Sequence, residues 1–412
     1  MVFAISLGAA LLLPVGSADD GAGDGAGENQ SVRVGTIADS HGSGRVLRDE
    51  VSSVPGQINF DSYIDWLNLQ INEAGLPGAA MAIVSSRDIL AMNTWGIREV
   101  GKQGQVDQQT VFRIASISKT FAGTVAAQLV NNDLYDWDEP LFKILPQNKF
   151  AKRGQTEQIS LRHLMSHTTG LMPHAYSNML DAGVGYSKIQ EKFQEIPVVC
   201  PPGKCYGYQN VVFSLVADVV QTRTESDYSH FLVDNIFTPL GMADASVGLD
   251  SYLSNSNASS AHQRTRGGWR VAKVNPAYYS VAPASGVNAS IRDMSRWAQA
   301  NLGAFPEVLS REMLAIQHKP VVETPRGNYF NRWPRLDKAY YALGWRVFDY
   351  AGIRVIHHGG GVRGFRSELA LIPEFDLGVV VLFNAESSVA NDVIPGFLDL
   401  AIDTYRSLQT QL

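Results

Sequence analysis

The sequence predicts an α/β (α+β) fold in which an antiparallel sheet flanked by helices is built from both ends of the chain, with a mostly helical part inserted between them. Short apolar runs separated by turn residues occur within residues 78–95 and again within 343–383. Between those two groups, residues 118–302 show mainly helical periodicity and loop-like stretches. At 412 residues, the chain is also longer than one ordinary core usually supports.

The first residues read as an export signal followed by a linker. Val2–Leu13 is an apolar run too short to span a bilayer, and small residues at Gly16–Ala18 suit cleavage, so we expect a signal peptide at residues 1–18. No Lys or Arg precedes the apolar run. Residues 19–56 are rich in Gly, Ser, Ala and Asp, which predicts a flexible linker. We therefore expect an exported protein of the bacterial periplasm with no stable membrane span after signal removal.

The folded domain is expected to occupy residues 57–412, with its α/β part at 57–115 and 335–412. It opens with a helix, because apolar residues within 63–71 recur every three or four positions. Two strand-like apolar runs follow, Gly78–Ser85 and Ile89–Trp95, with polar turn residues between them.

The helical part is expected at residues 116–334. Ser118–Leu134 has a helical composition, and Ser160 is typical of the N-cap of a short apolar helix ending at Ser166. Further helices are expected at Val211–Thr222, at Tyr228–Phe237 and from Asp293 to Leu302.

Strands return near the end of the chain. Leu343–Phe348 and Ile353–His357 flank one tight turn, and Ser367–Ile372 and Gly378–Phe383 flank a second. Strands joined by tight turns pair antiparallel, so these four runs should share a sheet. Apolar residues at helical spacing between Val389 and Tyr405 predict a closing helix.

The charge composition excludes nucleic acid as a partner. Lys plus Arg number 34 and Asp plus Glu 40, with no dense basic run, so the sequence lacks the clustered positive charge that nucleic-acid binding needs.

Cys200 and Cys205 would close a short disulfide loop in an oxidising compartment; two free thiols are the alternative. Two thiols without a nearby His make an incomplete zinc site. We expect a small-molecule substrate, no metal and no cofactor, and the sequence does not indicate an oligomeric state.

A candidate nucleophile lies in Ser116-Ile117-Ser118-Lys119, an S-x-x-K pattern at the start of a predicted helix. The positive end of the helix dipole favours an alkoxide or oxyanion there, and Lys119 falls on the same helical face as Ser116. A desolvated lysine can lose its proton and act as a base toward the serine hydroxyl. A surface Ser and Lys on a capped helix is the alternative interpretation.

The second candidate is a Y-x-N pattern, which occurs at Tyr176, Tyr208 and Tyr329. Tyr208 is favoured, because it follows a rigid Pro-Pro-Gly turn and leads directly into an apolar helix. A phenol near Lys119 would have its pKa lowered by the positive charge, which makes Tyr208 a candidate general base. Asn210 would offer its amide to the substrate or to Lys119.

The third candidate is His358-Gly359-Gly360-Gly361, which follows a predicted strand. Glycines there would let a substrate backbone approach the edge of the sheet, so His358, Gly359 and Gly360 are assigned to substrate binding. The amide of Gly361 would donate to an oxyanion together with the amide of Ser116. A phosphate-binding loop is the rival interpretation, but no helical pattern follows the glycines.

In combination these motifs resemble the class C β-lactamase and penicillin-binding-protein-like serine hydrolase family, close to the S12 peptidases, from about Asp61 to Leu408. The resemblance rests on Ser116–Phe121, Leu164–Leu171, Pro202-Gly203 before Tyr208–Asn210, Gly286–Asn288 with Asp293-Met294, Leu343–Trp345, and His358–Gly361 before Gly364-Phe365. It implies a β-lactamase/transpeptidase-like fold with the active site between an α/β and a helical part. It also implies that Ser116 is acylated and that Lys119 and Tyr208 share the proton transfer.

One position departs from true β-lactamases, which usually have Lys where this chain has His358. A largely uncharged histidine would attract the carboxylate of a penicillin less, so neutral esters or amides are expected to be better substrates. The implied activity is hydrolysis of a β-lactam, a D-amino-acid peptide or a small ester. The alternatives are a penicillin-binding or sensor protein that deacylates slowly, and a non-catalytic scaffold, which the presence of all the expected catalytic residues disfavours.

Overall fold

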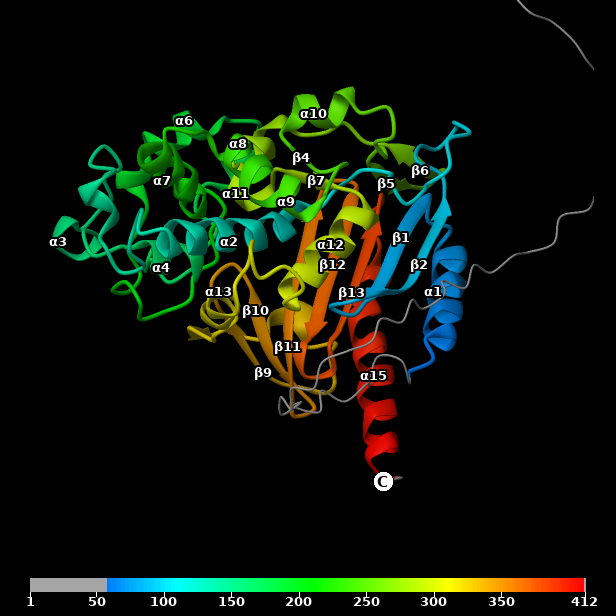
Figure 1. Ribbon diagram of the computed structural model, residues 1–412. Coiled ribbons are helices and arrows are strands. Elements are labelled where there is room, and N and C mark those ends of the chain that lie inside the picture. Colours follow the sequence, from blue (N-terminus) through cyan, green and yellow to red (C-terminus); the bar gives the residue numbers. More distant parts are fainter. Residues whose placement is uncertain (1–57, 411–412) are drawn as a thin grey trace, which may run out of the picture. The chain divides into compact units, whose positions relative to one another are not determined.

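The computed structural model describes residues 58–410. The expected signal peptide and most of the linker lie outside the described residues. Both the N-terminal and C-terminal thirds of the described chain contribute strands to a single eight-stranded sheet, in the order β2-β1-β13-β12-β11-β10-β9-β8 (Figure 1). Its strands are β1 (Gly78–Val84), β2 (Ile89–Gly96), β8 (Val322–Glu323), β9 (Leu336–Tyr341), β10 (Arg346–Tyr350), β11 (Ile353–Val362), β12 (Phe365–Ile372) and β13 (Leu377–Phe383).

All of these strands pair antiparallel with their neighbours, and the two ends of the chain meet where β1 pairs with β13, with Met81 opposite Val381. The β1 and β13 strands are apolar throughout and buried on both sides, because helices cover both faces of the sheet. Helices α1 (Asp61–Ala74) and α15 (Val393–Gln409) lie against one face (Figure 1).

The opposite face of the sheet packs on the helical part. Val380 and Leu382 share a hydrophobic core with α2 (Ser118–Asn131) and α12 (Ile291–Asn301), whereas Val379 and Val381 belong to the core under α1 and α15. This alternation follows the two-residue period of a strand. Helix α2 is buried along almost its whole length, and apart from Lys119 it carries only uncharged side chains, most of them small or apolar.

Short elements complete the helical part. They are α3 (Arg153–Thr156), α4 (Leu161–Met165), α5 (Ser177–Asp181), α6 (Tyr186–Gln190), α7 (Leu215–Thr224), α8 (Tyr228–Leu232), α9 (Thr238–Leu240), α10 (Leu249–Ser254), α11 (Ala282–Ser285), α13 (Arg311–Gln317) and α14 (Gly327–Phe330), with strands β3 (Phe112–Arg113), β4 (Ser246–Val247), β5 (His262–Thr265), β6 (Gly268–Val271) and β7 (Val287–Ala289). None of the helices within residues 58–410 is both long enough and apolar enough to cross a membrane.

Several elements differ from the sequence predictions. Strand β9 was not expected, because its charged residues Asp337 and Lys338 interrupt the apolar alternation. Strand β10 begins at Arg346 and not at Leu343, because Leu343–Trp345 forms a buried turn against α2. Strand β11 continues through the glycines to Val362.

Two helical boundaries also differ. Helix α12 is capped by Ser290, whose hydroxyl accepts from the amide of Asp293, so Asp293 is the third residue of the helix and not its cap. The helix predicted at Tyr228–Phe237 is α8 followed by a wider π-helical turn over Val233–Phe237.

Candidate active site

The candidate nucleophile Ser116 lies in a short 3₁₀ turn, Ala115–Ile117, that leads directly into α2. Ala115 has a φ of 50°, a left-handed conformation that costs energy for a residue with a side chain and that turns the chain sharply just before Ser116. The carbonyl of Ile114 accepts a hydrogen bond from Ser367 Oγ at 2.7 Å, which ties this segment to β12.

Gly360 explains why the third motif needs glycine. A Cβ atom at Gly360 would lie 2.2 Å from the carbonyl oxygen of Ile114 and 2.3 Å from Ser367 Oγ, so no side chain fits there. Sequence reasoning assigned Gly360 to contact with a substrate backbone. In the structure its close contact is instead with the segment that carries Ser116, and it sets the distance between that segment and β11.

Lys119 is the second residue of α2 and is completely buried, with its Nζ atom directed at three oxygen atoms. Nζ lies 2.7 Å from Asn210 Oδ1, 3.0 Å from the carbonyl oxygen of Ala284 and 3.4 Å from Ser116 Oγ. The amide of Asn210 is therefore engaged with Lys119. The structure brings Ser116, Lys119 and Asn210 together, as the sequence motifs predict.

The surroundings of Lys119 favour its neutral amine. Burial lowers its pKa well below the usual value, and the positive charge of Arg346 lowers it further. A neutral amine has two N–H bonds and one lone pair. The oxygens of Asn210 and Ala284 accept both N–H bonds, which leaves the lone pair for the hydroxyl proton of Ser116.

Tyr208 completes the group around Ser116. The Nζ atom of Lys119 lies 4.7 Å from the centre of its ring, and its hydroxyl hydrogen-bonds with Ser116. The expectation that the pKa of Tyr208 is lowered is wrong. Burial raises it above the value of an ordinary phenol, and the hydrogen bond with Ser116 and the charge of Arg346 oppose this only in part. Tyr208 therefore stays protonated at neutral pH.

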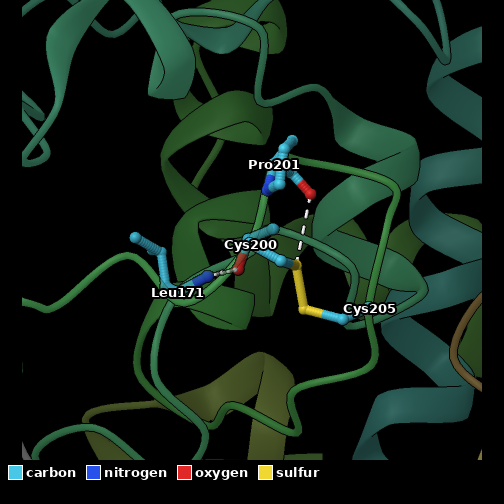
Figure 2. The surroundings of a disulfide bond; sticks show 5 residues. Leu171, Cys200, Pro201 and Cys205 are labelled. Carbon is cyan, nitrogen blue, oxygen red and sulfur yellow. Dashed lines mark hydrogen bonds between the residues drawn. A yellow bond between two sulfur atoms is a disulfide. The ribbon is translucent and has the colours of Figure 1, made fainter.

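The segment before Tyr208 is well fixed, as its sequence suggests. Figure 2 shows the disulfide between Cys200 and Cys205, whose Cα atoms lie 6.4 Å apart. The other matches to the Y-x-N pattern lie elsewhere: the hydroxyl of Tyr176 donates to the carbonyl of Lys192, and the side chain of Tyr329 lies outside the described residues.

His167, in the Leu164–Leu171 motif, packs directly against Tyr208. The ring centres of His167 and Tyr208 are 4.3 Å apart, and His167 Nδ1 accepts a hydrogen bond from the amide of Gln209 at 3.2 Å. Burial lowers the pKa of His167 well below its usual value, with Lys119 and Arg346 adding to the effect. A neutral His167 thus holds both the ring of Tyr208 and the backbone that follows it.

His358 is buried and lies beside the same ring system. Its Nε2 atom is 3.0 Å from the hydroxyl of Tyr341, and its Nδ1 atom is 2.8 Å from the carbonyl of Gly359. Both contacts are satisfied by the neutral tautomer that donates from Nδ1 and accepts at Nε2. Burial lowers the pKa of His358 well below its usual value, and the charge of Arg346 lowers it further. His358 therefore carries no fixed positive charge.

His357 faces the other side of β11, so the two neighbouring histidines have different environments. His357 Nε2 lies 3.0 Å from Oε2 of the buried Glu368, and Arg366 pairs with the other oxygen of that carboxylate at 3.0 Å. A Cβ atom at Gly359 would lie 2.8 Å from Glu368 Oε2, so this glycine makes room for the carboxylate.

The glycine segment of β11 forms an open strand edge. Strand β10 begins at Arg346, which pairs with His357, so residues 358–362 have β12 on one side and no β10 partner on the other. A cavity of about 290 Å³ lies beside this edge. It is lined by Tyr208, Phe330, Arg346, His357, His358, Gly359, Gly360, Gly361, Arg366 and Glu368.

Sequence reasoning missed Arg346, which is a central charge of this site. Its guanidinium lies 5.9 Å from the centre of the Tyr208 ring and 5.5 Å from that of Tyr341, and no ion pair among residues 58–410 includes it. The signal was a single charged residue inside the apolar run Leu343–Phe348. Arg346 therefore places a positive charge near the uncharged His358.

Within the described part of the chain, no group of three or more His, Cys, Asp or Glu side chains is placed to hold a metal ion. The arrangement instead offers a serine hydroxyl, a neutral amine, a protonated phenol and an open strand edge. Those groups are the components of acyl transfer to a serine.

Comparison with known proteins gives the same picture. A family model described as Beta-lactamase matches residues 60–402. The chain is 25% identical over 329 residues to a protein named unguisins hydrolase from Aspergillus campestris, covering 76% of this chain and 59% of that protein. It is 22% identical over 322 residues to protein flp of Staphylococcus aureus, with shares of 77% and 61%. The chain thus spans about three fifths of the length of these two relatives.

A β-lactamase from Escherichia coli is 24% identical over 367 residues, which cover 81% of this chain and 90% of that enzyme. Among solved structures, the octameric penicillin-binding protein homologue from Pyrococcus abyssi superposes with a TM-score of 0.74 at 19% identity, covering 84% of this chain and 78% of that one. At this identity the structural similarity shows a shared fold.

Proposed function

Because the chain belongs to the beta-lactamase family of serine hydrolases, we propose that it is an exported hydrolase that cleaves an amide or ester bond through an acyl-enzyme on Ser116. The observation that supports this best is the placement of Lys119. Its Nζ atom lies 3.4 Å from Ser116 Oγ and donates to two other oxygens, which leaves a lone pair for the serine proton.

In the proposed acylation step, Lys119 takes the proton of Ser116 and the serine oxygen attacks the substrate carbonyl. The negative charge then develops on the carbonyl oxygen, where the amides of Ser116 and Gly361 would donate to it. As the carbon–heteroatom bond breaks, the leaving group receives a proton through the hydroxyl of Tyr208, and the proton held on Lys119 replaces it. The raised pKa of Tyr208 suits a proton relay better than a standing phenolate base.

In the proposed deacylation step, water attacks the ester on Ser116, gives its proton to the same Lys119–Tyr208 pair, and Ser116 recovers its proton as the acid leaves. Substrates of the proposed class are β-lactams, D-amino-acid peptides and small esters. Export is supported by the Cys200–Cys205 disulfide, since disulfides persist in oxidising compartments such as the periplasm.

The deciding experiment treats purified mature protein with a fluorescent penicillin and a fluorophosphonate and measures intact mass. One adduct per chain is expected, mapped to Ser116 by peptide digestion and lost in Ser116→Ala. A label that persists in Ser116→Ala would refute the assignment. Stopped-flow hydrolysis of nitrocefin and p-nitrophenyl acetate separates the two functional alternatives, because slow deacylation gives a burst of one equivalent with little turnover after it.

A further inference from the structure

Three polar side chains beside the candidate active site have no part in the mechanism proposed above. Glu368 on β12 is completely buried, His357 on β11 is 1% exposed, and the side chain of Arg366 is 25% exposed. Arg366 Nη2 donates to Glu368 Oε1 at 3.0 Å, and His357 Nε2 lies 3.0 Å from Oε2. Because an ionised carboxylate only accepts hydrogen bonds, His357 donates from Nε2. We call these three residues the ion cluster.

The ion cluster packs directly against the glycines of β11. Gly359 lies opposite Glu368 in the β11–β12 ladder, and Gly361 lies opposite Arg366. Facing residues of an antiparallel pair project from the same face of the sheet. A Cβ atom at Gly359 would lie 2.8 Å from Glu368 Oε2. One at Gly361 would lie 3.3 Å from Arg366 Cδ, so the carboxylate and the arginine stem occupy the space beside both glycines.

The other face of the glycine segment is held by different contacts. There the carbonyl of Ile114 and Ser367 Oγ leave no room for a side chain at Gly360. The segment is therefore confined between the chain that carries Ser116 on one face and the ion cluster on the other. Strand β10 does not continue along its free edge, because the β10–β11 pairing ends at His357. Contacts on the two faces thus replace the second neighbouring strand that an interior strand would have.

Stability alone is a weak reason for an ion cluster at this position. Taking a carboxylate out of water is costly, and well-packed apolar residues of similar volume often give equal or greater stability. The rings of Phe348 and Trp333 lie 5.2 and 5.3 Å from the ring of His357, so this part of the core already packs apolar groups. A carboxylate that is held by two donors does, however, stay in one fixed orientation, which an apolar side chain would not ensure.

We propose that Glu368 is a positioning residue for acyl transfer. Held by His357 and Arg366, its carboxylate fixes the orientation of residues 359–361, so that the amide of Gly361 points at the carbonyl oxygen of the substrate. The inference rests on the proposed function, in which that amide stabilises the developing oxyanion. A displacement of about 1 Å can cost about 100-fold in rate, so a residue that acts only through the backbone can control catalysis.

The decisive variant is Glu368→Gln, which keeps the size of the side chain and removes its charge. With the neutral substrate p-nitrophenyl acetate, kcat should fall about 10–100-fold, while KM stays within about twofold. The affinity for phenylboronic acid, which forms a reversible tetrahedral anion on a reactive serine, should fall by the same factor. Removing a nearby negative charge would by itself favour that anion. A loss of affinity therefore identifies a change of position and not of charge.

A second variant tests the same contact without changing the net charge. Burial lowers the pKa of His357, which is therefore neutral at neutral pH, so His357→Phe removes only a donor to Glu368. The aromatic neighbours of His357 should accommodate the phenyl ring, and this variant decides the question if Glu368→Gln does not fold. In His357→Phe, kcat and the affinity for phenylboronic acid should fall together by several-fold.

The matched control is Asp399→Asn. It removes a carboxylate that accepts from Arg335 at 2.9 Å and from the hydroxyl of Tyr350 at 3.0 Å, away from the candidate active site. This variant should lower the melting temperature and leave both kcat and the affinity for phenylboronic acid unchanged. An effect on these two quantities as large as that of Glu368→Gln would show that any lost ion pair disturbs the site, and would overturn the inference.

Two other results would also count against a positioning role. One is a folded Glu368→Gln protein with unchanged kcat and unchanged affinity for phenylboronic acid. The other is a fall in kcat with no loss of that affinity. If the unsubstituted enzyme shows no hydrolysis that depends on Ser116, the proposed function fails and this inference fails with it. Hydrolysis that is indifferent to both Glu368→Gln and His357→Phe overturns this inference alone.

Discussion

Replacing Arg346 by Gln should move the acid limb of the pH–rate profile to higher pH. Lys119 must be neutral to accept the proton of Ser116, so its pKa sets that limb in the proposed mechanism. Lys119 Nζ and the Arg346 guanidinium lie 4.7 and 5.9 Å from the centre of the same Tyr208 ring, so they are separated by no more than the sum, 10.6 Å. At an effective dielectric constant of about 20, two charges at that separation repel by about 1.6 kcal/mol, or about one pKa unit.

The assay is kcat/KM for p-nitrophenyl acetate across pH, with substrate well below KM. In Arg346→Gln the pKa that sets the acid limb should rise by about one unit or more. At pH values below that pKa, kcat/KM should therefore fall about tenfold, and at pH values above it kcat/KM should change little. Arg346→Lys keeps the charge and should retain a limb near that of the unsubstituted enzyme, while melting temperatures report any loss of fold. A limb that stays in place in Arg346→Gln, or moves to lower pH, would refute the claim that Arg346 depresses the pKa of Lys119.

Three further changes test the site. Tyr208→Phe deletes one hydroxyl and should lower kcat about 10²–10⁴-fold with little change in melting temperature, whereas Tyr176→Phe should be close to silent; the reverse order would show that the wrong tyrosine was chosen. Gly360→Ala forces a methyl group against a backbone carbonyl and should cost about 1–3 kcal/mol in urea unfolding and lower kcat/KM strongly, so a variant with unchanged kinetics would contradict the fixed spacing. Cys200 and Cys205 should resist alkylation until reduced, and reduction should lower the melting temperature only modestly, because the closed loop is short; rapid alkylation of native protein would count against the disulfide.

The sequence predicts most of the sheet, because strands buried on both sides need uninterrupted apolar runs and β1 and β13 have them. The same rule misplaces the start of β10: Leu343–Trp345 is just as apolar, but it is buried as a turn against α2. There a Cβ atom at Gly344 would lie 2.4 Å from the carbonyl of Lys119, a long-range contact that periodicity does not reveal.

At the site, short motifs predict candidate residues that the structure brings together, but they do not give the protonation states of those residues. Local patterns predict Ser116, Lys119 and Tyr208: Ser116 and Lys119 lie where α2 begins, and Tyr208 lies in the loop before the 3₁₀ turn Val212–Ser214 that leads into α7. The predicted direction of the pKa shift of Tyr208 is wrong, because burial depends on residues distant in the sequence and outweighs the hydrogen bond with Ser116 and the charge of Arg346. Arg346 was missed for a related reason, since a lone arginine in a strand indicates function only once the tyrosines around it are known.

Because the amine of Lys119 is buried, the stability of the folded protein depends on pH. An unfolded chain exposes this lysine to water and takes up a proton below its ordinary pKa of 10.5, whereas the folded chain, with the lower pKa, does not. Unfolding therefore consumes a proton between those two pKa values, and the free energy of unfolding falls by about 1.4 kcal/mol for each unit of decreasing pH in that interval. His167 and His358 add the same kind of proton uptake below about pH 6.5, since burial depresses their pKa values as well. The groups that would make Ser116 reactive thus set an acid limit on the conditions in which the chain stays folded.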